Sequence, residues 1–279
     1  MKKLFSDIRA YICMALMIAV SGFFTAYFNL YNGIPNTEYS LSVISIGLML
    51  ALPLLTYPVF SKENADGFYS LQSSLGVRPA VLVAGKYLAC LTVFTISFLI
   101  LAIIPIISFF TSGTYLLGAY VGIIGYYLFG AAFIALMLFI SAISKNSLVS
   151  LIASYSVAVI SYFFEYLTIY VTASVTSALL LLTVLALLFA ICIYFMTKSE
   201  IVTIAFIVIT ETVVILFRFI SPTVFSSFYD IFMRVIAIRE RLSVFLYGIF
   251  DITAVIHYIV LTAVFVLLTV LGMRKRRFE

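Results

Sequence analysis

Long uninterrupted apolar runs constrain this chain more than any other feature of its sequence. Stretches such as 11–30, 87–110 and 119–143 hold no charged residue, and each reaches the ~20 residues that a helix needs to cross ~30 Å of hydrocarbon. The apolar residues are continuous rather than alternating, which favours helices over the strands of a membrane barrel. With 65% apolar and 10% charged residues, the chain lies outside the composition of soluble globular proteins. We therefore expect an all-α polytopic membrane protein.

The apolar runs predict eight spans joined mostly by short polar turns. These spans are residues 11–30, 41–60, 87–110, 119–143, 147–169, 178–196, 201–219 and 252–271. The first run is too long for a signal-peptide core and lacks a small-residue cleavage site, so we interpret it as a retained span. An alternative keeps six spans and treats 178–219 as a re-entrant or interfacial pair.

Basic residues fall mainly in the turns on one side of these spans. The other side holds only Arg234, Arg239 and Arg241, whereas the basic side holds Lys2, Lys3, Arg9, Lys62, Arg78, Lys86, Lys145, Lys198, Arg274, Lys275, Arg276 and Arg277. The positive-inside rule then predicts cytosolic N and C termini, which eight or six spans both allow. Because topology explains the net charge of +5, we expect a lipid bilayer and no nucleic acid as its partner.

Residues 61–86 are a polar stretch between two spans, and we expect them to face the cytosol. Within them Phe68, Leu71 and Leu75 recur on one face of a short helix, which Gly76 ends. Pro79 suits the first position of the helix that follows, since its missing N–H costs nothing there. Composition alone leaves two interpretations open, a helix lying on the membrane surface and a helix that docks on another protein.

Several short segments resemble bacterial ABC-2-type permeases, the membrane subunits of ATP-binding cassette exporters. The strongest resemblance is to the cytosolic segment after span two, and it rests on Phe60, Glu63, Gly67, Val77, Gly85, Lys86, Tyr87, Leu88 and Ala89. Residues 139–155 resemble the family's turn between spans four and five, and 248–251 resemble a phrase before its last span. The sequence departs from the family pattern at Gly76, where many members have proline, and in the extra pair of spans 178–219.

This resemblance implies an ABC-2 (type V exporter-like) transmembrane domain over residues 1–279, in a bacterial plasma membrane. It implies two permease copies, or this chain with a homologous partner, and separate ATPase subunits that hold ATP and Mg²⁺. The aromatic content of 16% would suit an amphipathic peptide, drug or lipid-like cargo, but Phe and Tyr also simply fill membrane helices and interfaces. The implied coupling residues, which would contact the ATPase, are Glu63, Gly67, Phe68, Leu71, Leu75 and Arg78.

Sequence motifs for catalysis are absent from the chain. No Gly-x-x-x-x-Gly-Lys-Ser/Thr phosphate loop, Gly-x-Ser-x-Gly elbow or His-Glu-x-x-His pair occurs. We expect a transport subunit rather than an enzyme, with no cofactor and no metal of its own. The alternative function is a secondary transporter or channel that works without an ATPase and uses Glu211 as an ion-coupling carboxylate.

Four ionisable residues fall inside apolar spans, where an unpaired charge costs ~2–3 kcal/mol on the most lenient scale. They are Glu165, Glu211, Arg218 and His257. One hypothesis joins them in a substrate or gating contact at the outer mouth. The interpretation we favour is structural, with Arg218 reaching outward to Glu165 and Glu211 held protonated.

Three further patterns bear on the packing of the spans. Pro53 and Pro58 predict a kink near the cytosolic end of span two. Residues 221–248 contain a segment with an apolar stripe, which we expect to lie flat on the outer interface. Glycines of span four have two interpretations, a close helix-packing face such as a dimer interface, or the general enrichment of glycine in membrane helices. They are Gly118, Gly122, Gly125 and Gly130.

Overall fold

A computed structural model describes most of the chain. The described residues are 8–65, 78–170, 174–197, 200–220 and 238–275, with a few more between 223 and 231. Throughout these ranges the chain is helical and contains no strand, which confirms the all-α prediction. The predicted short helix 68–75 and Gly67 lie outside the described residues, as do most of residues 221–237.

The chain divides into two compact units. Unit 1 comprises Met1–Ile160 and Arg241–Glu279, and unit 2 comprises Ser161–Glu240. Along unit 1 the helices are α2 (Ile8–Thr25), the π-helix η1 (Ala26–Tyr31), α3 (Glu38–Thr56), α4 (Pro58–Ala65), α6 (Pro79–Leu101), α7 (Ile104–Ser112), α8 (Leu116–Ile143), most of α9 (Ser147–Tyr170), α13 (Glu240–Leu246) apart from its first residue, and α14 (Ile252–Lys275).

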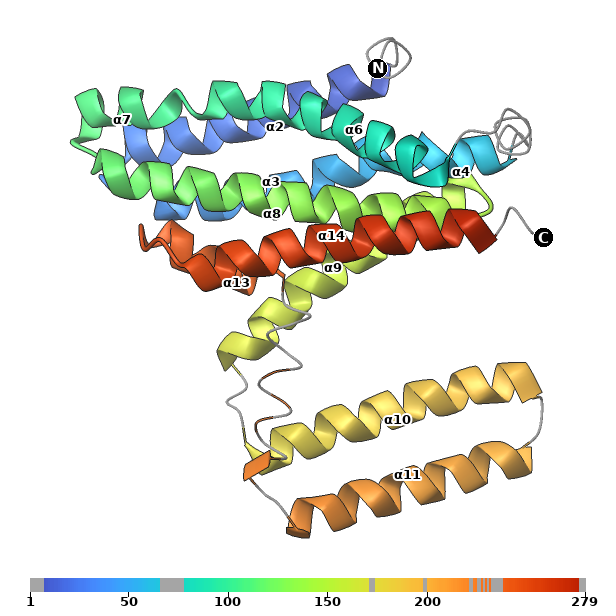
Figure 1. Cartoon of the computed structure of the whole chain (residues 1–279). Coiled ribbons are helices and arrows are strands. Elements are labelled where there is room, and N and C mark those ends of the chain that lie inside the picture. The colour runs from blue at the N-terminus through green and yellow to red at the C-terminus, as the bar shows by residue number, and fades with distance from the viewer. Residues whose placement is uncertain are drawn as a thin grey trace. The chain divides into compact units, whose positions relative to one another are not determined.

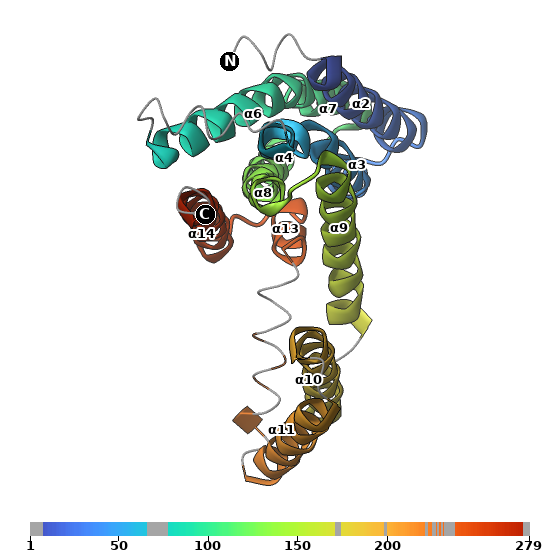
Figure 2. The same ribbon diagram turned by 90° about the vertical axis from the view of Figure 1, so that its right-hand side faces the viewer.

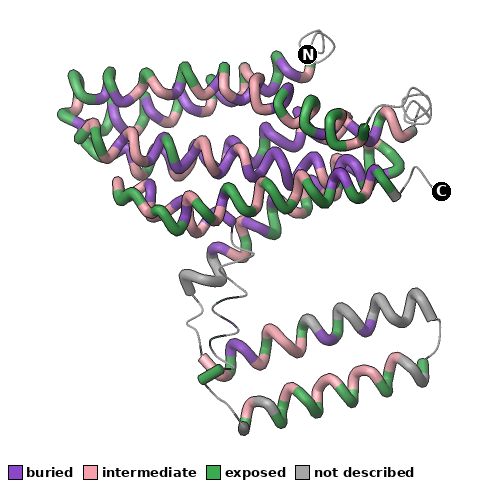
Figure 3. The backbone as a smooth tube through the Cα atoms, in the orientation of Figure 1, coloured by how far each residue is buried: buried purple, intermediate pink, exposed green. Residues whose placement is uncertain are grey.

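Helix α8 lies at the centre of unit 1. Figures 1 and 2 show α3, α4, α6 and α14 packed around it, and α8 contacts each of them. Of its most apolar stretch 72% is buried, against 22% for α2 and for α14, and Figure 3 shows the same contrast. Helices α2 and α14 therefore present most of their apolar surface outward, as helices in contact with lipid do.

The glycines of α8 make room for neighbours within the same chain. A Cβ on Gly125 would collide with Phe245 of α13, and a Cβ on Gly130 would collide with the ring of Phe94 on α6. Phe94 and Phe245 are themselves fully buried. The predicted packing face is thus occupied by α6 and α13 of this chain.

The C-terminal part of segment 221–248 contains α13. Leu242 and Phe245 of this helix are fully buried in unit 1. The small glycine surface of α8 lets α13 approach closely. The expectation that the segment lies flat on the outer interface stays a prediction. The apolar stripe at 225–235 lies outside the described residues.

Span two is interrupted where its prolines predict a kink. Helix α3 ends at Thr56 and α4 begins at Pro58, with Tyr57 as a turn residue between them. Proline has no N–H to give to the preceding turn, so one backbone hydrogen bond of a continuous helix is missing there. The Tyr57 N–H still donates to the Pro53 carbonyl at 3.0 Å. The helix then continues to Ala65, and Ser61 is fully buried, so the first residues of the predicted loop 61–86 belong to the bundle. Helix α6 begins at Pro79 as predicted.

Unit 2 contains a hairpin of two helices, α10 (Val175–Thr197) and α11 (Glu200–Ile220), which pack against each other. Ala178 and Tyr229 are buried in it among apolar side chains such as Phe164 and Val214. These helices correspond to the extra pair of predicted spans.

Six helical segments in the described ranges are long and apolar enough to cross a membrane. They are Ile8–Tyr31, Glu38–Asn64, Pro79–Ser112, Leu116–Ile143, Ser147–Glu165 and Ile252–Arg274. The chain thus has the character of a multi-pass membrane protein.

We predict that Gly125→Ala lowers the stability of the protein, because a methyl group there overpacks the contact with Phe245. The expected loss in the free energy of unfolding is about 1–3 kcal/mol. Gly22→Ala is the matched control, since a Cβ on Gly22 meets nothing within 4 Å. Unfolding of both purified variants in mixed detergent measures the difference, and equal stabilities would contradict the packing described for α8.

Candidate functional site

The candidate site lies at the end of unit 1 that collects the exposed basic residues. Helix α2 begins at this end, α4 ends there, α6 begins there, and the turn from α8 to α9 and the last residues of α14 lie there too (Figure 1). Its exposed cations come from four different parts of the sequence and are Lys62, Arg78, Lys145 and Arg274. The structure therefore gathers at one end the residues that the charge pattern assigns to the cytosol.

Lys86 joins α6 to α4. Its ammonium group forms an ion pair with Glu63, donates a hydrogen bond to the carbonyl of Val59 at 2.8 Å, and lies 4.1 Å from the centre of the Phe60 ring. Phe60 is fully buried, and both charged side chains are largely shielded from solvent. A cation over an aromatic face is attracted to it. The contact thus holds together the two helices that flank residues 66–77.

The break at Tyr57 is closed by serine hydroxyl groups, which we call the Tyr57 network. The carbonyl of Tyr57 accepts hydrogen bonds from Ser61 on α4, Ser141 on α8 at 2.7 Å and Ser150 on α9 at 3.0 Å. The Ser141 hydroxyl also accepts the backbone N–H groups of Phe60 at 3.1 Å and Ser61 at 3.2 Å. Its one donor and two acceptor positions are all used. All three serines are fully buried.

Asn64 adds a second attachment of α4 to the end of α8. Its side-chain amide donates to the carbonyl of Ala142 at 3.2 Å and to that of Ser144 at 3.1 Å. Asn146 follows in the turn and accepts the N–H of Leu148 at 3.0 Å, which caps the start of α9. The last turn of α8 thus pairs its carbonyls with a side chain from α4.

Of the predicted coupling residues, the structure describes two. Glu63 lies on α4 and is paired with Lys86 inside the chain, and Arg78 is the exposed residue that precedes α6. Gly67, Phe68, Leu71 and Leu75 fall outside the described residues. Sequence reasoning missed Asn64, Ser141 and Ser150. Ser141 and Ser150 lie in the resembling segment 139–155, but their spacing does not reveal which backbone groups they bind.

The intramembrane acid Glu165 has a buried partner that the sequence reasoning did not choose. It forms an ion pair with Arg239, and both residues are buried, at 7% and 5% exposure. The Arg239 guanidinium also lies 5.4 Å from the centre of the Tyr162 ring. We expected Arg218 in this role and placed Arg239 outside. The missed signal is that three arginines follow Arg218 in the sequence, each a possible partner for an acid near the outer end of a span.

The other three residues of the predicted polar cluster belong to α11 and α14. Glu211 is half-buried on α11, and Arg218 lies further along α11, 6.0 Å from the centre of the Phe219 ring. His257 lies on α14 in unit 1, whereas Glu165, Glu211 and Arg218 belong to unit 2. The structure thus pairs Glu165 with Arg239 and leaves the proposed four-residue contact untested.

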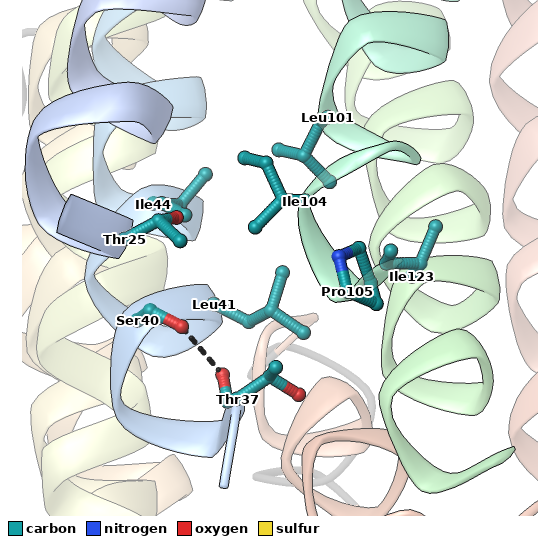
Figure 4. Close-up of a pocket in the computed structure, with 9 residues that line it drawn as sticks. All are labelled: Thr25, Thr37, Ser40, Leu41, Ile44, Leu101, Ile104, Pro105 and Ile123. Atoms are coloured by element: carbon teal, nitrogen blue, oxygen red, sulfur yellow. Dashed lines mark hydrogen bonds between the residues drawn. The ribbon is translucent and has the colours of Figure 1, made fainter. Parts of the chain in front are cut away.

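A small cavity lies in unit 1 between α2, α3, α7 and α8 (Figure 4). Its volume is about 10 Å³, and its lining includes Thr25, Ser40 and Pro105. That is about the room one water molecule needs. The Thr25 hydroxyl is buried with no hydrogen-bond partner in the structure, so a water is the fitting occupant. The cavity is too small for an amphipathic cargo molecule.

Metal binding has no support in the part of the chain that the structure describes, because no three His, Cys, Asp or Glu side chains converge there. Comparison with known proteins gives no assignment: no protein-family model, no curated protein and no solved structure matches this chain.

We predict that Glu165→Gln destabilises the protein, because it removes the carboxylate that pairs with the buried Arg239 guanidinium. Breaking one side of a buried ion pair costs about 3–5 kcal/mol. The double variant Glu165→Leu with Arg239→Met removes both charges and should recover most of that loss. Glu211→Gln on α11 is the control and should behave as the wild type. The free energy of unfolding is measured for the wild type, the two single variants and the double variant. A double variant no more stable than Glu165→Gln would contradict the pairing.

Proposed function

We propose that this chain is the membrane subunit of an ABC-2-type ATP-binding cassette exporter. The observation that supports it most is that residues carrying the family resemblance, far apart in the sequence, contact one another. Phe60, Glu63 and Lys86 form one cluster of ion pair and cation–π contact. Phe60 and Glu63 precede residues 66–77, and Lys86 follows them. The contact among these three residues therefore fixes the positions of the two helices from which that segment starts and ends.

A second resembling segment meets the same place. Residues 139–155 include Ser141 and Ser150, whose hydroxyls bind the Tyr57 carbonyl. Ala142 and Ser144 in the same segment accept the Asn64 amide. The two segments that resemble the family, 60–89 and 139–155, are thus in contact along α4.

The exposed cations at this end support a cytosolic placement. Lys62, Arg78, Lys145 and Arg274 surround the ends of α4, α6, α8 and α14. The positive-inside rule assigns such an end to the cytosol. Residues 66–77 are then in reach of a soluble ATPase, and we assign the docking contact to their apolar stripe Phe68, Leu71 and Leu75, with Arg78 beside it.

In the proposed exporter this chain forms the translocation pathway with a second permease, in a bacterial plasma membrane. ATP and Mg²⁺ are held by the separate ATPase, and closure of its subunits pushes on residues 63–75 and tilts spans two and three. The spans number eight if α10 and α11 both cross the membrane, or six if they form a re-entrant pair. Either number keeps the two termini in the cytosol. An amphipathic peptide, drug or lipid-like molecule is the proposed cargo.

We predict that the chain, tagged and purified from membranes of its own host, carries an ATP-hydrolysing subunit with it. Leu71→Glu with Leu75→Glu should abolish this association, because it places charge on the proposed apolar docking stripe. Ser70→Ala with Ser74→Ala alters the same segment off the stripe and should leave the association intact. A wild-type chain that purifies without an ATPase, or that alone catalyses ion-driven cargo flux in vesicles, would contradict the proposal.

We also predict that Ser70→Cys, in a variant without the native cysteines, reacts with a membrane-impermeant maleimide only from the cytosolic side. Asn32→Cys, in the loop between η1 and α3, is the control and should react only from outside. Labelling of intact cells and of inverted vesicles measures both. Reaction of residue 70 in intact cells would overturn the orientation.

A further inference from the structure

The first turn of α4 is attached to its neighbours through its own backbone. The Tyr57 carbonyl is bound by hydroxyls from α8 and α9, the N–H groups of Phe60 and Ser61 are bound by Ser141, and the Val59 carbonyl is bound by Lys86. The first N–H groups of a helix have no partner along that helix and must find one elsewhere. Here α6, α8 and α9 provide hydrogen-bonding partners for the backbone groups of this turn.

The last turn of α4 is attached as well. Glu63 forms its ion pair with Lys86 on α6, and the Asn64 amide bridges two carbonyls at the end of α8. Helix α4 is therefore bound at both of its ends, and its partners are α6, α8 and α9.

The connection between α3 and α4 has fewer backbone hydrogen bonds than a continuous helix. Pro53 lies inside α3 and Pro58 begins α4, so two backbone N–H groups that would stabilise a continuous helix are missing within a short stretch. A kink of this kind is where a helix bends most readily.

We propose that α4 moves together with the end of α8, the start of α9 and the start of α6, and that the chain bends between α3 and α4 at Tyr57 and Pro58. Asn64 and Ser141 are then positioning residues, because they fix α4 and with it the start of residues 66–77. The consequence for transport rests on the proposed function: a push from the ATPase on residues 66–77 is handed through α4 to α8 and α9. The turn from α8 to α9 becomes part of the coupling machinery.

The test uses spin labels on the full-length chain at Lys62→Cys and Lys145→Cys, in a variant without the native cysteines. Both sites are exposed, one on α4 and one in the turn between α8 and α9. The parent protein should give one narrow distance distribution, because the two sites belong to one rigid body. Asn64→Ala and Ser141→Ala should each broaden it or add a second population.

The chain offers a matched control in Ser154→Ala. Ser154 is a fully buried serine of α9 whose hydroxyl has no hydrogen-bond partner in the structure, so its removal should leave the distribution narrow. Ser141→Thr keeps the hydroxyl and should restore the parent distribution. Asn64 is only half-buried, so Asn64→Ala is expected to fold even if Ser141→Ala does not.

A broad distribution in the parent, or a narrow one in both Asn64→Ala and Ser141→Ala, would overturn the proposal. The distance measurement needs no ATPase, so its outcome is independent of the proposed function.

A second experiment tests the functional consequence by purifying the variants with the ATPase and measuring export. Asn64→Ala should still retain the ATPase, because the docking stripe is unchanged, but should lose the coupling of ATP hydrolysis to export. Normal export by Asn64→Ala would overturn the role of α4 in transmission.

Discussion

The pairing of backbone groups inside an apolar bundle is the constraint on which the rest of this structure depends. In hydrocarbon an unpaired N–H or C=O costs several kcal/mol, so a break in a helix persists only where other groups take the place of the lost bonds. The break at Tyr57 meets this condition through Ser61, Ser141 and Ser150. Since these serines come from α4, α8 and α9, satisfying one carbonyl also fixes how three helices meet.

The same reasoning connects packing with the position of the candidate site. Helix α8 can lie at the centre of unit 1 because Gly125 and Gly130 leave space for Phe245 and Phe94. With α8 held there, its last turn lies beside α4, and Ser141 reaches Tyr57. Close packing in the middle of the bundle thus determines which hydroxyls are available at its end.

Much of this fold is predictable from sequence, because lipid imposes simple rules on length, polarity and charge. The helical class, most of the spans, the break at the prolines of span two and the start of α6 at Pro79 all follow from such rules. The partners of polar groups do not. Arg239, rather than Arg218, pairs with Glu165 because the pairing depends on how distant segments pack, which residue spacing does not encode. Ser141 and Asn64 were missed for the same reason.

Two ion pairs in the described part of the chain illustrate different uses of charge in a membrane protein. Glu165 and Arg239 are both buried, so their pairing chiefly avoids the cost of an isolated charge. Glu63 and Lys86 are less completely buried, and Lys86 also binds a carbonyl and an aromatic ring of α4. This pair joins α4 to α6. Its value lies in geometry, because it fixes the separation of the two helices from which residues 66–77 emerge. A docking segment needs such fixed ends, since a force applied to a segment with free ends moves the segment and leaves the spans in place.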